Sequence, residues 1–145
     1  MNVSVMKEKI KPDTYDFLIE KAKEVRGRAY APYSKLQVGA ALLTVKGNVY
    51  TGCNVENASF GLTSCAERNA IFKAVSEEGP QMKIEAIAIS VNTTHFIPPC
   101  GACRQVIAEF INTGKKGTSV LFKSGKGFVN RKIEYLLPDT FVFKK

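Results

Sequence analysis

The chain has 145 residues, of which 45% are hydrophobic and 23% are charged, and its formal net charge is +8 at pH 7. This length suits one domain with one core, so we expect a single domain over residues 1–145. No stretch approaches the roughly 20 apolar residues of a membrane span, which excludes a transmembrane protein. Charges crowd the amino terminus, so we expect no secretory signal and predict a cytoplasmic protein with reduced cysteines.

Positive charge gathers from residue 115 to the end of the sequence, where only Glu134 and Asp139 oppose it. The basic residues there are Lys115, Lys116, Lys123, Lys126, Arg131, Lys132, Lys144 and Lys145. Such a bias can attract phosphates, but a solvated basic surface is the simpler explanation. We therefore do not expect nucleic acid as a partner.

The first half of the chain predicts a helix followed by a β-hairpin. Apolar residues recur at helical spacing over Asp13–Ala29, with Asp13 as N-cap, and Pro32 follows the expected end. Two partly alternating apolar segments, Leu36–Val45 and Val49–Val55, flank a Lys46-Gly47-Asn48 turn. This pattern predicts two antiparallel strands.

The second half alternates helical and strand patterns. We expect a helix from Ser64 to Gly79-Pro80, a strand over Ile84–Val91, a helix over Cys100–Ile111, strands over Val120–Phe122 and Phe128–Ile133, and a short helix over Glu134–Leu137. The order α-β-β-α-β-α-β-β predicts a three-layer α/β/α sandwich with a mixed five-stranded sheet. Two helices that enter after strands bring their amino termini together at one edge of such a sheet.

A C-x-x-C motif opens the third predicted helix, at Cys100 and Cys103. Both thiols share the first helical turn, where free N–H groups and the helix dipole favour thiolates, the form that binds zinc. Alone, this motif also fits a dithiol redox site or half of a structural zinc ribbon. A second feature must decide between these possibilities.

That feature is Cys65-Ala66-Glu67 at the start of the second predicted helix, which with P-C-x-x-C downstream matches the deaminase signature. Three thiolates leave a fourth tetrahedral position for water, as in a catalytic zinc site. Cys53 could close that position, but its apolar strand context predicts a buried thiol without a metal.

Glu67 would stand beside this open position and shuttle protons between water and substrate. Its alternative role is structural, because Ser64 and Glu67 also satisfy the S-x-x-E capping box. Arg68 and Arg104 directly follow motif residues, and we expect both to donate hydrogen bonds to the thiolate sulfurs and to offset their charge.

The chain resembles the small cytidine deaminases in five ordered segments. These are AYAPYSKLQVGAALL, GCNVENASFG, SCAERNAIFKAV, PPCGACRQVIAEF and LLPDTF. The resemblance implies hydrolysis of cytidine and deoxycytidine to uridine and deoxyuridine plus ammonia, in pyrimidine salvage, with one Zn²⁺ per subunit. It also implies a homotetramer with shared active sites.

The resemblance implies roles for further residues. Asn54 and Glu56 should bind the ribose hydroxyls, and the backbone at Ala66 should hold the pyrimidine edge. Phe141 should enter the site of a neighbouring subunit. Leu36 departs from the family, which usually has phenylalanine beside the nucleoside, so it keeps an apolar wall without aromatic stacking.

Three alternatives stay open at this point. A related deaminase of blasticidin-type antibiotics shares the same metal motif, although the Asn54 and Glu56 pair favours a nucleoside. The protein could instead be a zinc-stabilised nucleic-acid-binding module, or its C-x-x-C pair could be a redox dithiol, but neither role accounts for the spacing of Glu67.

Overall fold

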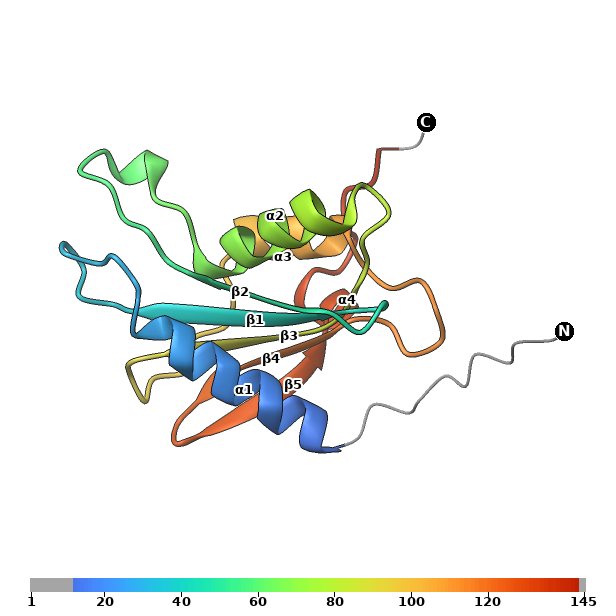
Figure 1. Cartoon of the computed structure of the whole chain (residues 1–145), viewed down its shortest axis with the longest axis horizontal. Helices are drawn as coiled ribbons and strands as arrows, with labels where there is room; N and C mark the ends of the chain where they lie inside the picture. Colours follow the sequence, from blue (N-terminus) through green and yellow to red (C-terminus); the bar gives the residue numbers. More distant parts are fainter. Residues whose placement is uncertain (1–11, 144–145) are drawn as a thin grey trace, which may run out of the picture.

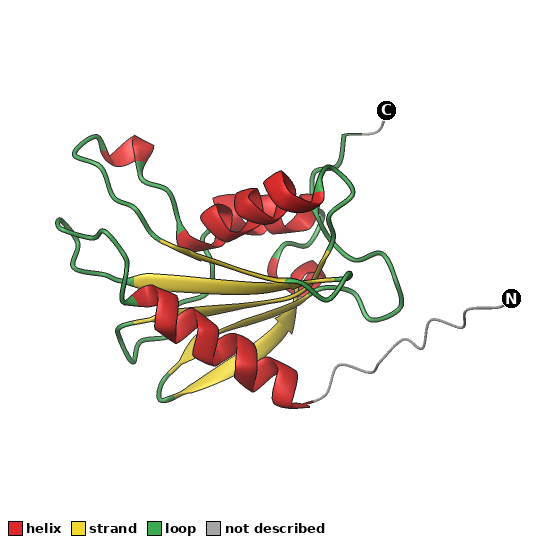
Figure 2. Ribbon diagram, viewed as in Figure 1, coloured by secondary structure: helices red, strands yellow, loops and turns green. Residues whose placement is uncertain are grey.

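A computed structural model describes residues 12–143 and shows a sheet covered by helices on both faces (Figures 1 and 2). The helices are α1 (Pro12–Arg26), α2 (Ala66–Glu78), α3 (Gly101–Glu109) and the short α4 (Ile133–Leu136), with a 3₁₀ turn at Phe60–Leu62. The strands are β1 (Val38–Thr44), β2 (Val49–Cys53), β3 (Ile84–Val91), β4 (Ser119–Ser124) and β5 (Gly127–Lys132). The predicted element order is confirmed. Lys144 and Lys145 lie outside the described residues.

The five strands form one mixed sheet in the order β2-β1-β3-β4-β5. β1 pairs antiparallel with both β2 and β3, β3 and β4 are parallel, and β4 and β5 form an antiparallel hairpin. α1 covers one face, and α2 and α3 cover the other (Figure 2). The mixed sheet between helices is the predicted fold class.

The alternation of side chains divides the core between the two faces of the sheet. On the α1 side, Leu18 and Ala22 pack against small strand residues such as Ala86 and Ala88. On the α2 and α3 side, the larger Ile87 joins the main hydrophobic cluster. β3 is buried on both faces, as its continuous apolar sequence predicts.

Two glycines allow the helices to approach the sheet closely. A Cβ on Gly39 would lie 2.1 Å from the Ala22 carbonyl oxygen of α1, and one on Gly52 would lie 2.5 Å from the Ala70 backbone nitrogen of α2. Neither backbone position has room for a larger residue. These contacts fix how α1 and α2 lie across β1 and β2.

The first helix and the hairpin differ from their predicted bounds. α1 begins at Pro12, so Asp13 lies in the first turn and is not the N-cap. The helix ends at Arg26, because the following N–H groups make tighter i to i−3 bonds, such as Arg28 N to Val25 O at 3.0 Å. β1 begins only at Val38, because Leu36 is paired with an asparagine side chain and not with a strand.

The later elements are shifted by smaller amounts. α3 ends at Glu109 and not Ile111, because the Phe110 carbonyl accepts the Ile84 N–H at 2.8 Å and thereby joins β3. β4 extends beyond the predicted Val120–Phe122, and β5 is shifted by one residue from the predicted Phe128–Ile133, because the two strands pair with each other from Ser119–Lys132 to Ser124–Gly127 and Ile133 begins α4. Over the described residues, no helix combines the length and apolar character needed to cross a bilayer.

Candidate active site and metal centre

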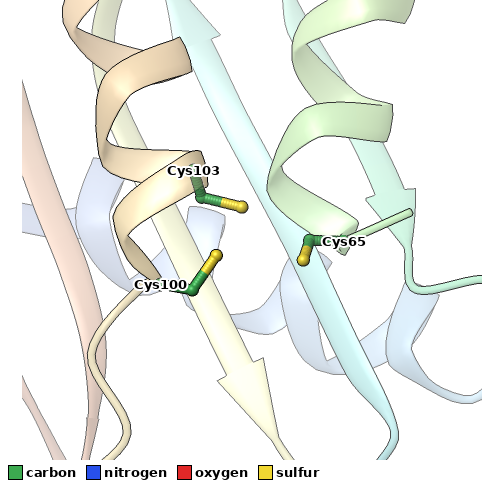
Figure 3. A group of neighbouring side chains, drawn as sticks. All are labelled: Cys65, Cys100 and Cys103. Carbon is green, nitrogen blue, oxygen red and sulfur yellow. The ribbon is translucent and has the colours of Figure 1, made fainter. Parts of the chain in front are cut away.

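Three thiols meet where the amino termini of α2 and α3 approach each other. Cys65 and Cys100 are the N-cap residues of these helices, and Cys103 lies in the first turn of α3. Their sulfur atoms lie within 4.8 Å of one another and point toward a common centre (Figure 3). Convergent helix starts therefore bring together ligands that are 35 residues apart in the chain.

The donor set fits one zinc ion. Tetrahedral zinc with Zn–S bonds of about 2.3 Å requires sulfur atoms roughly 3.8 Å apart, so this group needs only small side-chain adjustments to bind the ion. No other cysteine, histidine or acidic residue of the described chain belongs to the group, and Cys53 lies outside it. Three protein ligands with a fourth position left open are typical of a catalytic zinc site.

The thiols already share their protons unevenly. A hydrogen bond from Cys103, and then the Arg68 guanidinium, lower the pKa of Cys65 to about 5. The same bond to Cys65, together with burial, raises the pKa of Cys103. Cys65 is therefore the thiol that ionises more readily than Cys103, and a metal that binds to the group displaces the remaining protons.

The two arginines that follow the motifs differ in their partners. Arg68 Nη2 lies 3.3 Å from Cys65 Sγ and 3.4 Å from the Thr63 carbonyl oxygen. Arg104 does not contact a sulfur, contrary to our expectation; it donates to the carbonyl oxygens of Pro99 and Leu136, both at 2.8 Å. Only Arg68 offsets thiolate charge directly, whereas Arg104 ties the segment before Cys100 to α4.

Glu67 lies in the first turn of α2 and is only 5% exposed. Burial raises the pKa of its carboxyl group to about 7. The capping-box alternative is wrong, because the N-cap is Cys65 and the Ser64 hydroxyl donates to Asn69 Oδ1 at 2.6 Å. Glu67 is therefore a buried acid beside the thiols with no capping duty.

A cavity of about 260 Å³ opens beside the metal centre. It is lined by Ser34, Leu36, Val38, Asn54, Glu56, Thr63, Cys65, Ala66, Glu67, Ile89, Val91, Ile97, Pro98 and Cys100. The aliphatic residues give the cavity an apolar wall, while the polar residues come from the segment before β1, the segment between β2 and α2, and the starts of α2 and α3. The cavity therefore offers an apolar wall and polar groups to one ligand.

Asn54 and Glu56 are buried and line this cavity, and the protein already uses part of their hydrogen-bonding capacity. Asn54 accepts the Val38 N–H and donates to the Leu36 carbonyl oxygen, both at 2.8 Å. An amide has two donors and two lone pairs, so one of each remains for a ligand. The Asn54 side chain thus takes the place of a neighbouring strand for the backbone of Leu36 and Val38, and it still lines the cavity.

Glu56 accepts three hydrogen bonds from the segment that precedes Leu36. Oε2 accepts the Tyr33 and Ser34 N–H groups at 3.0 and 3.2 Å, and Oε1 accepts the Ser34 hydroxyl. The bond from the Ser34 hydroxyl, followed by the two N–H groups, lowers the pKa of this carboxyl group. The ionised carboxylate keeps acceptor capacity for a ligand hydroxyl.

The remaining predicted site residues lie in different places. Leu36 and Ala66 line the cavity, and Ala66 is the first residue of α2, where N–H groups lack helical partners. Phe141 is 72% exposed and does not line the cavity of its own chain. Its carbonyl oxygen accepts a hydrogen bond from Gln105 Nε2 at 3.3 Å.

Sequence reasoning missed several residues of the cavity wall. Ser34 lies two positions before Leu36 and has no motif of its own, and only the proximity of Glu56 gives its hydroxyl a role. Ile97 and Pro98 precede Cys100 and lie outside every predicted element. Their closeness to a metal-ligating cysteine was the available signal.

Comparisons with known proteins agree with this geometry. Residues 12–115 match the family described as the cytidine and deoxycytidylate deaminase zinc-binding region. A cytidine deaminase from Sporosarcina psychrophila is 54% identical over 95 residues, 66% of this chain and 68% of that protein. One from Mycobacterium tuberculosis is 38% identical over 131 residues, 90% of this chain and 92% of that protein.

A solved structure is similar as well. The crystal structure of cytidine deaminase from Burkholderia pseudomallei matches with a TM-score of 0.78 and 47% sequence identity, over 88% of this chain and 99% of that one. The family match over residues 12–115 includes all three cysteines of the metal centre and Glu67.

Proposed function

The chain belongs to the family of cytidine and deoxycytidylate deaminases, and from that membership we propose that it hydrolyses cytidine and deoxycytidine to uridine and deoxyuridine with release of ammonia. One observation carries this proposal: the buried Glu67 and the thiols Cys65 and Cys100 line the same cavity as Asn54 and Glu56. A proton shuttle, a metal centre and polar groups for a sugar therefore face one ligand.

Cys65, Cys100 and Cys103 would hold the zinc ion, which when bound supplies a Lewis acid that activates one water molecule. Glu67 takes a proton from that water at a carboxylate oxygen, because its pKa of about 7 lies near the working pH. It delivers that proton to the ring nitrogen, then takes the second proton from the hydroxyl added to the ring carbon and delivers it to the departing amine. Water supplies the new carbonyl oxygen, and nitrogen leaves as ammonia.

Other residues of the chain bind and orient the nucleoside. The free acceptor and donor capacity of Glu56 and Asn54 suits the hydroxyls of a ribose. Leu36 and the aliphatic residues around it exclude water and contact the faces of the pyrimidine. The N–H groups at Ala66 are placed to bind the polar edge of the ring.

We extend the proposal to assembly and cellular role. Exposed aromatic residues near the carboxyl terminus, such as Phe141 and Phe143, support a homotetramer in which Phe141 completes a neighbouring site. A metal centre of three reduced thiols supports a cytoplasmic location, and the reaction suits pyrimidine salvage. Native mass measurement tests the assembly, because four chains of 15.9 kDa are expected and a monomer would refute it.

The function itself is tested with purified zinc-loaded protein. Loss of cytidine absorbance and release of ammonia are followed with and without a chelator, beside deoxycytidine, cytosine, CMP and blasticidin. Turnover of both nucleosides that stops on zinc removal is expected. Turnover of blasticidin alone, or none of any substrate, would refute the proposed function.

A further inference from the structure

The two halves of the proposed site are joined at one junction. After β2 the chain forms a loop whose two ends run antiparallel to each other. At these ends Val55 and Ser64 exchange two backbone hydrogen bonds of 3.0 Å. Val55 lies between Asn54 and Glu56, and Ser64 directly precedes the thiol Cys65. The segment after β2, which carries the sugar-binding pair, thus lies beside the helix start that carries the metal ligand.

One side chain makes a second connection across this junction. Asn69 Nδ2 donates to the Cys53 carbonyl oxygen at 2.8 Å, and Asn69 Oδ1 accepts the Ser64 hydroxyl at 2.6 Å. The Asn69 backbone N–H also bonds the Cys65 carbonyl oxygen at 3.1 Å. Asn69 therefore bonds Cys53, the last residue of β2, and also Ser64 and Cys65 at the start of α2.

The packing around Asn69 leaves little freedom at this point. A Cβ on Gly52 would lie 2.7 Å from the Ala66 carbonyl oxygen, so the first turn of α2 lies directly on the end of β2. The Asn69 amide is half-buried in that contact and does not line the cavity. It is placed to set the position of α2 relative to β2 without touching a substrate.

We propose that Asn69 is a positioning residue that holds the nucleoside-binding end of β2 and the metal-binding start of α2 in the separation that the reaction requires. The inference rests on the proposed function, because the proposed function assigns the segment after the end of β2 to sugar binding and the start of α2 to the reacting ring. A displacement of about 1 Å between them costs on the order of a hundredfold in rate when reacting groups are otherwise aligned. The sugar contacts of Asn54 and Glu56, in the segment after β2, stay intact.

Asn69→Leu tests this role, because leucine keeps a similar volume and removes both side-chain hydrogen bonds. We expect kcat for cytidine to fall about tenfold or more, while KM changes by less than about twofold and one zinc per chain is retained. Asn112→Leu is the matched control. Asn112 is also a half-buried asparagine, but it bonds Glu85 at the start of β3, whereas the cavity is lined by Ile89 and Val91 near its end.

Zinc content and uridine binding by calorimetry accompany the kinetics. Equal kcat values for Asn69→Leu and Asn112→Leu, or loss of zinc from Asn69→Leu alone, would overturn the proposal. Absence of turnover by the unmodified protein would instead refute the proposed function. Uridine affinity of Asn69→Leu should stay within about twofold of the unmodified protein, because Asn54 and Glu56 are untouched, and a larger loss would also overturn the proposal.

A second variant keeps the test usable if Asn69→Leu does not fold. Ser64→Ala removes only the hydroxyl that bonds Asn69 Oδ1 and is expected to lower kcat severalfold. In the double variant the two losses should overlap, since both act through one connection. Unchanged kcat in Ser64→Ala, or fully additive losses, would contradict the role given to Asn69.

Discussion

Leu36 forms part of the cavity wall, and its position is fixed by the protein around it. Its carbonyl oxygen accepts a hydrogen bond from Asn54, and its N–H donates to the Ser34 hydroxyl at 3.0 Å. The next residue is held in turn, because Gln37 N–H donates to Asn92 Oδ1 at 3.0 Å. A larger side chain at position 36 would therefore extend into the cavity without moving the backbone.

Leu36→Phe should lower the KM for cytidine. Stacking of a phenyl ring on the pyrimidine adds about 0.5–1.5 kcal/mol beyond area burial, which corresponds to roughly a two- to tenfold change. Steady-state kinetics measure it, with Leu62→Phe as the control, because Leu62 is exposed and does not line the cavity. An unchanged or raised KM in Leu36→Phe would sink this interpretation.

Glu56 makes the segment before Leu36 sensitive to acid. Its pKa is lowered in the folded protein, so the unfolded chain binds the proton first as the pH falls. Its stabilising contribution is complete above the ordinary value of 4.5 and is lost as the pH falls through the lower folded value.

Glu56→Gln should therefore lose less stability than the unmodified protein between about pH 7 and about pH 3.5. Denaturant unfolding at both pH values measures the difference. Glu134→Gln, at an exposed position, should keep the unmodified dependence. If Glu56→Gln also kept it, the hydrogen bonds to Ser34 and Tyr33 would have no role in acid stability.

Single residues also show where sequence reasoning succeeds and where it stops. The grouping of the three thiols could be predicted from the spacing of the cysteines, because each cysteine motif lies at the start of a helix and the two helix starts meet. Arg68 and Arg104 hold equivalent places after their motifs, yet only Arg68 contacts a sulfur. That difference depends on the carbonyl groups of Pro99 and Leu136, which no local pattern reveals.

Among the elements, the contact between α2 and β2 positions the site. Gly52 permits this close contact because it has no side chain. Gly52→Ala should destabilise the protein by about 1–3 kcal/mol, since the added Cβ meets the backbone nitrogen of Ala70 and cannot be accommodated by a side-chain movement. Thermal or denaturant unfolding measures the change. Gly61→Ala is the matched control, with no atom within 4 Å of the added Cβ, and equal stability of both variants would contradict the close contact.

Two of the element boundaries that differ from the prediction, the start of β1 and the end of α3, share one cause. The strand predicted from Leu36 begins at Val38 because asparagine side chains take the place of strand partners at residues 36 and 37. The helix predicted to Ile111 ends at Glu109 because Phe110 bonds β3. Tertiary hydrogen bonds decided each of these ends, whereas apolar periodicity was enough to predict the elements themselves.

At the scale of the whole molecule, the sandwich brings residues from four separated segments around one cavity. α1 packs on one face through Gly39, and α2 and α3 pack on the other with their amino termini at the same end of the sheet. The order of elements predicted this arrangement, because two helices that follow strands start at a common edge. It did not predict the aliphatic wall, since Ile89, Val91 and Ile97 become neighbours of Leu36 only in the folded chain.

The proposed function depends above all on Glu67, which we propose carries protons at a zinc centre formed by Cys65, Cys100 and Cys103. The most direct measurement is ammonia release from cytidine by zinc-loaded Glu67→Gln beside the unmodified protein, with zinc content and unfolding followed on the same samples. We expect a loss of about 10²–10⁴-fold in kcat with zinc and fold retained. Equal deamination by the two proteins would contradict the role of Glu67 in proton transfer.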